Sequence, residues 1–369
     1  MASSQLELGI AVVGTGFGQK IHIPGFQTHH RTRVVGVYHR NLEKAEAIAA
    51  AHQIDHACDR VEDIVALPGV DGVAISTPPF LHWPTAEIAL KAGKHVLLEK
   101  PTALSVAEAQ QIQSLAQANN RVVGLDFEFR FIPAWQRLAE LLADNYVGQK
   151  RLITINWLGA SRANPQRAWS WYAQSAKGGG TLGSIGSHTF DYIRWLFGPV
   201  AQLNARLTTT ITKRPDPETG QLKPVDSDDT CNISLTLADG TPCQVNLSAI
   251  TAGGRGHWVE IYGDRGTLVL GNDNPKDYIH GFKLWAAKAG DKLSEVSIPE
   301  RLAFPQTYPD GRLAPFIRVI DHWVSDIDRG VATAPSIAEG LASQQLMDLS
   351  HQSHRTGTWI TLASTDGNP

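Results

Sequence analysis

Glycines are concentrated in a short segment near the start of the chain, directly after an apolar run at residues 10–14. The segment consists of Gly14, Thr15, Gly16, Phe17 and Gly18. In a strand-to-helix turn of this kind, the first glycine permits the sharp bend. The second lets the backbone approach a pyrophosphate, which the N–H groups of the following helix bind. Gln19 stands where the usual G-x-G-x-x-G pattern has its third glycine, and a glycine-rich turn can also be only a turn. Its place in the first strand–helix unit nevertheless predicts dinucleotide binding.

Two basic residues follow the second apolar run, at residues 34–38. They are His39 and Arg40. A site that prefers NAD usually has Asp or Glu here, because a carboxylate binds the ribose 2′-OH and repels a 2′-phosphate. A guanidinium group can instead pair with that phosphate through two hydrogen bonds. The sequence therefore predicts NADP(H) as the preferred cofactor and NAD(H) as the second choice. The alternative is that Arg40 is a solvated loop residue.

Lys100 ends another apolar segment, residues 95–99, and precedes Pro101. Oxidation of an alcohol requires removal of the hydroxyl proton while a hydride leaves the carbon. A lysine in a partly dry pocket beside a cationic ring has its ammonium form disfavoured and is suited to this task. The carboxyl ends of parallel strands are also where such folds bind ligands. From these residues alone, a surface lysine before a proline is the simpler interpretation.

A second group of polar residues lies on the helix predicted after Gly180. Ser184 and His188 are four positions apart and so share one helix face, and Asp191 follows three positions later. Histidine can hydrogen-bond a substrate hydroxyl and exchange a proton near neutral pH. The alternative is a histidine that only packs on its helix. Asp191 could orient the imidazole or pair with Arg194.

The composition excludes several classes of protein. A chain of 369 residues suggests two domains, and 42% hydrophobic with 19% charged residues is usual for a globular protein. A net charge of −3 argues against a nucleic-acid-binding protein. No apolar run reaches the roughly 18–20 residues of a membrane span, and no secretory signal is evident at the start. Cys58, Cys231 and Cys243 lie far apart, so we expect no metal site, no disulfide framework and a cytoplasmic location.

Residues 1–126 alternate apolar runs with amphipathic segments, which is typical of a doubly wound α/β domain. The runs are continuous, as expected for parallel strands with helices on both faces of the sheet. They lie at residues 10–14, 34–38, 72–76, 95–99 and 122–126.

Residues 127–369 are predicted to form an α+β domain with a largely antiparallel sheet. Alternating apolar and polar residues at 231–237 and 243–250 flank an Asp-Gly turn, and 258–271 and 282–298 look like two further hairpins. One-sided alternation leaves one face of the sheet open. Exposed Val, Leu and Ile on that face would suit an interface, so we expect a homodimer or a homotetramer.

The chain closes with two predicted helices. Phe316, Val319, Ile320, Trp323 and Ile327 form an apolar stripe on the first of them. These last helices could pack back on the first domain. Before them, residues 213–229 are expected to form a long polar loop.

Three short signatures occur in order along the chain. They are Ser76, Thr77, Pro78 and Pro79 with His82; Glu99, Lys100 and Pro101; and the segment GGGTLGSIGSHTFDYIRWLFG from residue 178. Together they resemble the Gfo/Idh/MocA family of NAD(P)-dependent oxidoreductases, over essentially the whole chain. The resemblance implies a Rossmann domain followed by an open-faced antiparallel sheet that often serves oligomerisation. It also implies a small-molecule substrate that is a sugar, an inositol or a related polyol.

The resemblance assigns roles to individual residues. Besides the glycine turn, His39 and Arg40, the cofactor-binding positions that it implies are Ser76, Thr77, Pro78, His82, Glu99 and Lys100. Lys100 and His188 become the catalytic pair, and Pro101 is expected to follow a cis peptide bond. His22 and His82 match histidines near the cofactor and are expected to support it structurally. Many family members carry an acid where this chain has Ser184, so His188 lacks that carboxylate here.

Substrate contacts are expected from the second domain. The candidates are Arg130, Trp171, Tyr172, Ser184 and His188. Aromatic faces stack on the C–H surface of sugars or on flat rings, although most tryptophans pack in cores. Arg130 could reach the pocket or form a salt bridge between the domains.

Three functions are consistent with these residues. The first is an NADP(H)-preferring oxidoreductase that moves hydride between the nicotinamide and an alcohol or carbonyl group of a polyol. The second keeps the fold but acts on a cyclic diol or an aromatic-ring compound. The third is a cofactor-binding sensor with little turnover, which the absence of an acid at Ser184 would favour.

Overall fold

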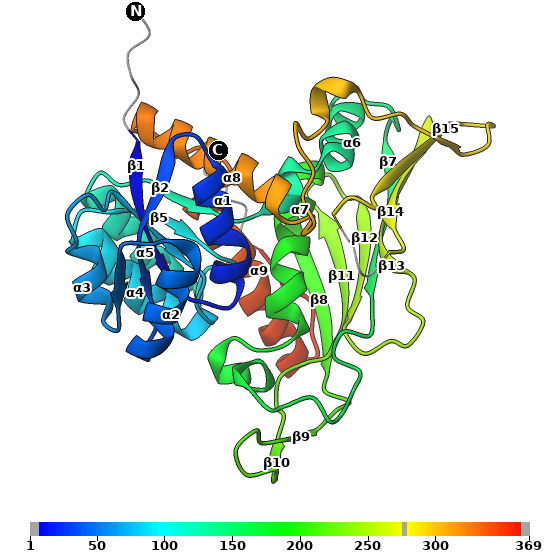
Figure 1. Cartoon of the computed structure of the whole chain (residues 1–369). Coiled ribbons are helices and arrows are strands. Elements are labelled where there is room, and N and C mark those ends of the chain that lie inside the picture. Colours follow the sequence, from blue (N-terminus) through cyan, green and yellow to red (C-terminus); the bar gives the residue numbers. More distant parts are fainter. Residues whose placement is uncertain (1–6, 275–278, 363–369) are drawn as a thin grey trace, which may run out of the picture. The chain divides into compact units, whose positions relative to one another are not determined.

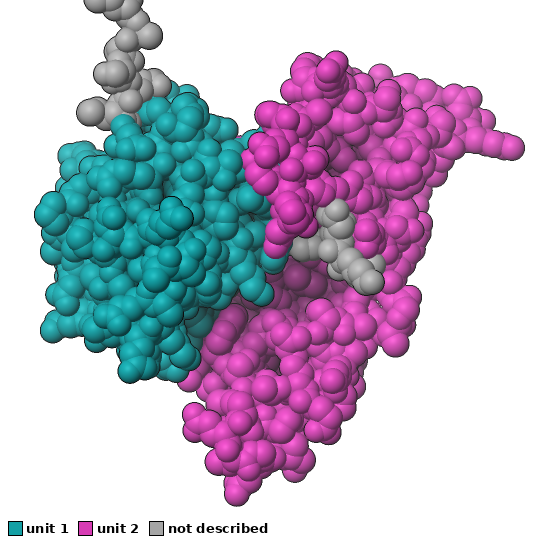
Figure 2. Space-filling model, viewed as in Figure 1, with its two compact units in different colours: residues 1–128, 312–344 teal, residues 129–311, 345–369 magenta. Residues whose placement is uncertain are grey.

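The computed structural model describes residues 7–274 and 279–362, and Figure 2 shows the two compact units that the chain forms. The first unit contains residues 1–128 and 312–344, and the second contains residues 129–311 and 345–369. The chain therefore leaves the first unit, builds most of the second, and then returns.

The first unit is built on a six-stranded parallel sheet with the order β3-β2-β1-β4-β5-β6 (Figure 1). The strands are β1 (Leu8–Val13), β2 (Thr32–Tyr38), β3 (His56–Cys58), β4 (Gly72–Ile75), β5 (His95–Leu98) and β6 (Val123–Leu125). The predicted doubly wound α/β fold is confirmed. β3 escaped prediction because it has only three residues and none of them is fully buried.

Helices connect these strands and pack in pairs, α1 with α8 and α4 with α5. Their bounds are η1 (Gly18–His22), α1 (Ile23–Thr28), α2 (Leu42–His52), α3 (Val61–Val65), η2 (Pro79–Leu81), α4 (His82–Lys91), α5 (Val106–Ala118) and α8 (Leu313–Arg329). The predicted apolar stripe on α8 carries Trp323, which is 1% exposed and packs against Phe26 of α1. Packing of this stripe explains why a late helix belongs to the first unit.

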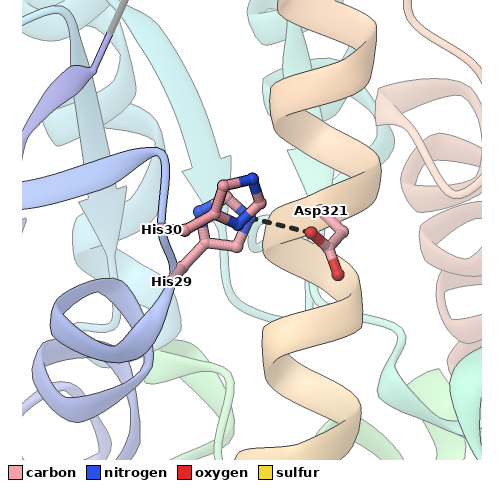
Figure 3. Close-up of side chains that lie close together, drawn as sticks. All are labelled: His29, His30 and Asp321. Atoms are coloured by element: carbon pink, nitrogen blue, oxygen red, sulfur yellow. Dashed lines mark hydrogen bonds and ion pairs between the residues drawn. The ribbon is translucent and has the colours of Figure 1, made fainter. Parts of the chain in front are cut away.

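Two polar contacts fasten α8 to the segment after α1. Nε2 of His29 lies 2.8 Å from Oδ1 of Asp321 (Figure 3), and the Arg31 guanidinium pairs with both oxygens of Asp328 at 2.9 and 3.0 Å. The Arg31 N–H donates to Nδ1 of His29 at 3.2 Å, so the imidazole carries its proton on Nε2 and donates it to Asp321. The ligand atoms of His29, His30 and Asp321 lie within 4.8 Å of one another. A metal ion there would have to displace that proton, so His29 and Asp321 serve to anchor α8.

The second unit is built on a nine-stranded sheet with the order β16-β15-β14-β13-β7-β12-β11-β8-β17. Its strands are β7 (Lys150–Leu158), β8 (Val200–Thr208), β11 (Thr230–Leu237), β12 (Pro242–Ser248), β13 (Gly256–Gly263), β14 (Gly266–Asn272), β15 (Lys283–Lys288), β16 (Ser294–Glu295) and β17 (Ile360–Thr361). Neighbours are antiparallel except for β7 and β12. The three predicted hairpins correspond to β11–β12, β13–β14 and β15–β16, so the largely antiparallel sheet is confirmed.

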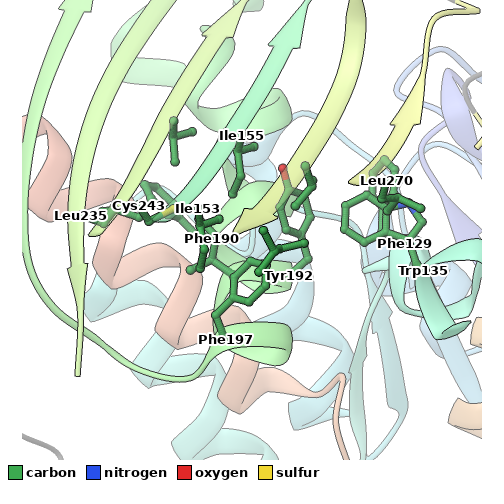
Figure 4. Packing of buried hydrophobic residues seen from close by; sticks show 14 of the residues in the cluster. Phe129, Trp135, Ile153, Ile155, Phe190, Tyr192, Phe197, Leu235, Cys243 and Leu270 are labelled. Carbon is green, nitrogen blue, oxygen red and sulfur yellow. The ribbon is translucent and has the colours of Figure 1, made fainter. Parts of the chain in front are cut away.

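One face of this sheet carries the core of the second unit (Figure 4). The helical segments of this part of the chain are η3 (Glu128–Phe131), α6 (Pro133–Ala143), η4 (Trp171–Ala173), η5 (Ser175–Lys177), η6 (Leu182–Gly186), α7 (Ser187–Phe197) and η7 (Glu300–Leu302). The helix α9 (Ile337–Thr356) belongs to the first unit up to residue 344 and to the second unit from residue 345. Phe190 of α7 and Trp135 of α6 are fully buried in that core together with Ile153 and Cys243 of the sheet. The core therefore fixes the helix that carries the predicted histidine.

The other face of the sheet is polar at its centre. Asn232 donates to Asn246 at 2.9 Å and Asn246 donates to Asn156 at 3.0 Å, so an amide ladder crosses β11, β12 and β7. Trp258 of β13 and Trp285 of β15 stack at 5.6 Å between ring centroids across the intervening strand β14. The expectation of exposed Val, Leu and Ile on this face holds only in part. Leu152 of β7, on the same face as Asn156, is 37% exposed, whereas alternation turns most apolar residues of the sheet to the covered side.

The polar loop at residues 213–229 contains a two-stranded ribbon, β9 (Lys213–Pro215) paired with β10 (Leu222–Pro224). Arg214 of this ribbon is buried, and its guanidinium donates to the carbonyl groups of Arg162 and Asn164 at 2.7 Å each. The ribbon therefore holds the segment near residues 162–164 in place. Among the described residues, every helix is too short or too polar to cross a membrane.

Candidate active site

The glycine turn follows β1 and packs against the turn after β4. Gly14 has φ +112°, and a Cβ there would lie 2.6 Å from the backbone of Ser76. A Cβ on Gly18 would lie 2.4 Å from the Ser76 hydroxyl, which also lies 3.1 Å from the Gly14 carbonyl oxygen. A Cβ on Gly16 would meet nothing within 4 Å. Gly14 and Gly18 are thus required by packing, whereas the backbone at Gly16 is open to a ligand such as a pyrophosphate.

Gly18 also explains why Gln19 is tolerated. A Cβ on Gly18 would approach Val12 of β1 at 3.3 Å, so Gly18 makes the close helix–strand contact that the third glycine of the usual pattern makes. The following helix is continuous from η1 into α1. The residues present therefore fit a dinucleotide.

His39 and Arg40 follow β2 as predicted, but only the His39 side chain is held by a hydrogen bond. Nδ1 of His39 accepts the Asn41 N–H at 3.0 Å, and the Asn41 side chain caps α2 by accepting the Lys44 N–H at 2.9 Å. Arg40 is exposed, and within residues 7–274 and 279–362 it makes no hydrogen bond or ion pair. Its guanidinium is available to an anion at the carboxyl end of β2.

His82 connects the turns that follow β4 and β5. Its side chain is fully buried, with Nε2 2.8 Å from the Thr77 carbonyl oxygen and Nδ1 2.8 Å from the Pro101 carbonyl oxygen. Burial lowers the pKa of His82, so the imidazole is neutral at physiological pH. The Lys100–Pro101 peptide bond is cis, as the resemblance implied. His82 therefore positions the loops that carry Thr77 and Lys100, and its burial leaves it unable to touch a ligand itself.

Behind Lys100 lies a buried cluster of His22, Glu99 and Asp126, whose ligand-type atoms are within 4.8 Å of one another. Nε2 of His22 donates to Oε1 of Glu99 at 3.0 Å, and Oε2 of Glu99 accepts the Lys100 N–H at 3.3 Å. Burial acts to raise the pKa of Glu99, but His22, Lys100 and Asp126 together lower it. Burial and the Glu99 charge raise the pKa of Asp126 well above its usual range. Glu99 is therefore the ionised carboxylate and Asp126 the protonated one.

In the second unit, the triple glycine and Asp228 fix the start of the helix that carries Ser184 and His188. A Cβ on Gly179 would lie 2.3 Å from the Tyr172 carbonyl oxygen, and Gly180 has φ +108° with its Cβ position 2.5 Å from the Asp228 carboxylate. That carboxylate accepts the Leu182 N–H at 2.8 Å. Burial raises the pKa of Asp228. The glycines are thus needed because Asp228 and Tyr172 approach the helix start closely.

Ser184 lies in the π-helical turn η6, one turn before His188 of α7. Its hydroxyl is 2.9 Å from the hydroxyl of Tyr172, which is 9% exposed. His188 is 5% exposed and packs edge-on against Phe129 at 4.9 Å between ring centroids. Turns of π-helix are frequent at functional sites. Tyr172 thus reaches the site through Ser184, while Trp171 remains half-buried beside it at 5.7 Å.

Arg130 and Asp191 form a buried ion pair within the second unit. Nη2 and Nε of Arg130 lie 2.6 and 2.9 Å from the two oxygens of Asp191. Arg130 was expected either to reach the pocket or to form a salt bridge between the domains. The structure shows a salt bridge, and both of its residues belong to the second unit. Asp191 pairs with Arg130 rather than with Arg194.

Comparisons with known proteins cover nearly the whole chain. Residues 8–127 match the oxidoreductase family with an NAD-binding Rossmann fold, and residues 139–362 match its C-terminal alpha/beta domain. The chain belongs to the Gfo/Idh/MocA family of oxidoreductases. An uncharacterized oxidoreductase of Synechocystis sp. is 50% identical over 97% of both chains. Levoglucosan dehydrogenase of Pseudarthrobacter phenanthrenivorans is 28% identical over 71% of this chain and 73% of the relative.

Solved structures show the same fold. A levoglucosan dehydrogenase in complex with NADH and L-sorbose has a TM-score of 0.85 at 24% identity, covering 97% of this chain and 99% of that chain. An oxidoreductase domain protein from Kribbella flavida has a TM-score of 0.87 at 24% identity, covering 97% and 100%. As a member of the Gfo/Idh/MocA family, the chain is a nicotinamide-dependent oxidoreductase of alcohol or carbonyl groups.

Sequence reasoning missed two residues that organise this Gfo/Idh/MocA site. Asp126 ends an apolar run and was assigned only to a strand, whereas Asp228 lies in the polar loop and gave no signal. Their roles arise from contacts with Glu99 and with Leu182, both far away in the sequence.

The protonation of Asp126 predicts a pH-dependent stability difference for Asp126→Asn. Because the folded-state pKa of Asp126 is raised, the folded chain holds a proton that the unfolded chain has released above about pH 4. The wild type therefore loses up to about 1.4 kcal/mol per pH unit from this group as pH rises through that window. Asparagine has no proton to release. The free energy of unfolding of Asp126→Asn should therefore rise relative to that of the wild type as the pH increases from 5 to 8.

Urea unfolding at each pH measures this difference. Asp55→Asn, at an exposed position of the same unit, is the control and should show a constant difference. A constant difference for Asp126→Asn as well would mean that Asp126 is ionised in the fold.

Proposed function

We propose that this protein is an NADP(H)-preferring oxidoreductase that acts on a sugar, an inositol or a related polyol. The observation that carries the proposal is the arrangement at the carboxyl edge of the parallel sheet. The open Gly16 turn packs on Ser76 after β4, and Lys100 follows the neighbouring strand β5. The sugar-directed names of the relatives, levoglucosan dehydrogenase among them, support a polyol as the substrate.

The residues of the chain divide the work around the hydride transfer that a bound nicotinamide supplies. Lys100 removes the hydroxyl proton in the oxidative direction and returns it in reduction. Glu99 accepts the Lys100 N–H and so holds the backbone there in place, and Asp126 in turn hydrogen-bonds Glu99. His188 hydrogen-bonds the substrate and exchanges a proton with it. Ser184 contributes a hydroxyl held by Tyr172 where many relatives use an acid, so the proton chemistry rests on Lys100 and His188.

Arg40 is proposed as the residue that selects NADP(H). Losing a charge-assisted pair with a 2′-phosphate weakens binding by about 1.5–3 kcal/mol, roughly 10- to 150-fold. Arg40→Ala should therefore raise the Kd of NADP⁺ by that factor while changing the Kd of NAD⁺ less than about threefold. Quenching of tryptophan fluorescence measures both constants, with Arg60→Ala, exposed in the same unit, as the control. Tighter binding of NAD⁺ than NADP⁺ by the wild type would contradict the proposal.

Lys100→Ala tests the catalytic assignment. Loss of a general acid–base group lowers the rate by about 10²–10⁴-fold, so kcat on any polyol substrate should fall by this factor. The Kd of the cofactor should stay within a few-fold, because the proposed task of Lys100 is on the substrate hydroxyl. Lys91→Ala, at an exposed position on α4, should behave as the wild type. An equal loss of cofactor affinity and rate would show that Lys100 only anchors the cofactor.

We also propose that the protein is cytoplasmic and forms a homodimer or homotetramer through the open face of its sheet. The free thiols Cys58, Cys231 and Cys243 support a reducing compartment. For self-association, the amide ladder through Asn246 and the stacked Trp258 and Trp285 offer a flat surface that a second copy could match by symmetry.

Sedimentation velocity at micromolar concentration tests the assembly. The wild type should sediment as a dimer or tetramer, and Asn246→Arg at the centre of the face should shift it to monomer by burying an unpaired charge. Glu46→Arg, exposed on α2, serves as the control. A monomeric wild type would refute the proposed assembly.

A further inference from the structure

Arg162 of the second unit carries a positive charge that no carboxylate balances. Its guanidinium lies over the ring of Tyr172, 3.1 Å from the ring centroid, and the side chain is half-buried. Among the residues that the structure describes, no carboxylate lies within ion-pair distance of Arg162. Arg130 and Arg137, in the same unit, pair with Asp191 and Glu140. Arg214 also lacks a carboxylate, but its guanidinium is satisfied by two carbonyl groups. The described partner of Arg162 is the face of an aromatic ring. A partly desolvated charge without an anionic partner is unfavourable, so Arg162 calls for a counter-ion.

The surroundings of Arg162 make the positive field stronger rather than weaker. Arg167 and Arg214 both act on its charge, and together with burial they lower the pKa of Arg162. The Arg214 guanidinium donates to the carbonyl groups of Arg162 and Asn164. The Arg167 guanidinium donates to the carbonyl oxygen of Ser161. Three cations thus converge, and their direct partners are carbonyl oxygens and an aromatic ring. The Asp229 carboxylate acts on the charge of Arg214 without forming an ion pair with it.

The position of Arg162 is fixed by the fold. Its N–H donates to the Ala249 carbonyl oxygen at 2.8 Å, and its own carbonyl oxygen accepts from Arg214 at 2.7 Å. The buried segment after Asp226 holds the Tyr172 backbone in place, because the Ser227 hydroxyl donates to the Tyr172 carbonyl oxygen at 2.7 Å. A guanidinium held in this way is preorganised to bind a planar or tetrahedral anion through two hydrogen bonds.

Arg162 is connected to the candidate site through a single ring. The Tyr172 hydroxyl lies 2.9 Å from Ser184, on the continuous helix that also carries His188. The Tyr172 ring and the Ser184 hydroxyl, which connect Arg162 to the site, are neutral. The Asp228 carboxylate also acts on Tyr172, and burial raises the pKa of that carboxyl group. A ligand hydrogen-bonded at Ser184 would therefore meet the positive charge of Arg162 next to it.

We propose that Arg162 binds an anionic substituent of the substrate, so that the enzyme acts on an acidic sugar, one bearing a carboxylate or a phosphate, in preference to a neutral polyol. The inference rests on the proposed function and narrows its substrate class. The 2′-phosphate of the cofactor is assigned to Arg40 in the other unit, which leaves the charge at Arg162 for the substrate.

Matched sets of sugars test this preference. Each set contains a neutral sugar, its uronate or aldonate, and its phosphate, for example D-glucose, D-glucuronate, D-gluconate and D-glucose 6-phosphate, assayed with NADP⁺ and with NAD⁺. The wild type should show a kcat/KM at least about tenfold higher for a charged sugar than for its neutral partner. Whether carboxylates or phosphates are preferred identifies the anion.

Arg162→Gln should lower kcat/KM for the charged sugar by about 10- to 100-fold, mainly through KM, and change that of the neutral partner less than threefold. Arg162→Lys keeps the charge but loses the two-point hydrogen bonding, so its effect should be intermediate. Arg206→Gln, exposed on β8, is the matched control. If Arg162→Gln does not fold, the wild type still decides the matter, because raising NaCl from 50 to 500 mM should raise KM for the charged sugar only.

The outcomes separate this inference from the proposed function. Equal kcat/KM values for charged and neutral sugars, or an equal loss on both in Arg162→Gln, overturn the role of Arg162 and leave the oxidoreductase standing. If no sugar is turned over with either cofactor, the proposed substrate class fails, and binding decides the inference. The inference is supported if D-gluconate or D-glucose 6-phosphate quenches tryptophan fluorescence, D-glucose does not, and Arg162→Gln abolishes the quenching. Equal quenching by the charged and the neutral sugars overturns the inference.

Discussion

The close contact between the turn after β1 and the turn after β4 is the constraint on which the nucleotide-binding half of the site depends. Gly14 and Gly18 approach Ser76 at distances that leave no room for a Cβ atom. The strand order changes direction between β1 and β4. The carboxyl ends of these two strands therefore border the crevice in which doubly wound folds bind ligands. A side chain at either glycine would separate the two turns. Gly16, the one open position of the three, is then the point where the backbone can approach a phosphate.

Buried carboxyl groups stabilise the segments that carry the proposed catalytic side chains in both units. In the first, Glu99 holds the Lys100 backbone and is balanced by His22, while Asp126 remains protonated beside it. In the second, Asp228 accepts the first N–H group of the helix that leads to His188. Burying a carboxylate is unfavourable unless hydrogen bonds or a proton compensate it. Each of these groups meets that condition, so the hydrogen bonds that hold the segments near Lys100 and His188 are formed at little cost.

The arginines show where charge is left for ligands. Arg31 and Arg130 are largely buried, and each forms a two-point ion pair with an aspartate, which makes them structural. Arg40 and Arg162 have no such partner among the described residues, although one is fully exposed and the other stacks on Tyr172. The same side-chain type therefore fastens helices in one setting and offers an anion site in another. The two settings differ in whether carboxylates, or carbonyl groups as at Arg214, satisfy the guanidinium.

The sequence alone determined the features that depend on local pattern. Continuous apolar runs marked five of the six strands of the parallel sheet, alternation marked three hairpins, and the glycines marked the turn that now packs on Ser76. These follow because strand period and turn chemistry are properties of neighbouring residues. Tertiary structure decided that α8 does return to the first unit, which the sequence left open. It alone decided the polar centre of the open face, the protonated Asp126 and the unbalanced charge of Arg162. Each depends on side chains that lie far apart in the chain, such as Trp323 against Phe26 or Asp228 against Gly180, and no local pattern records such contacts.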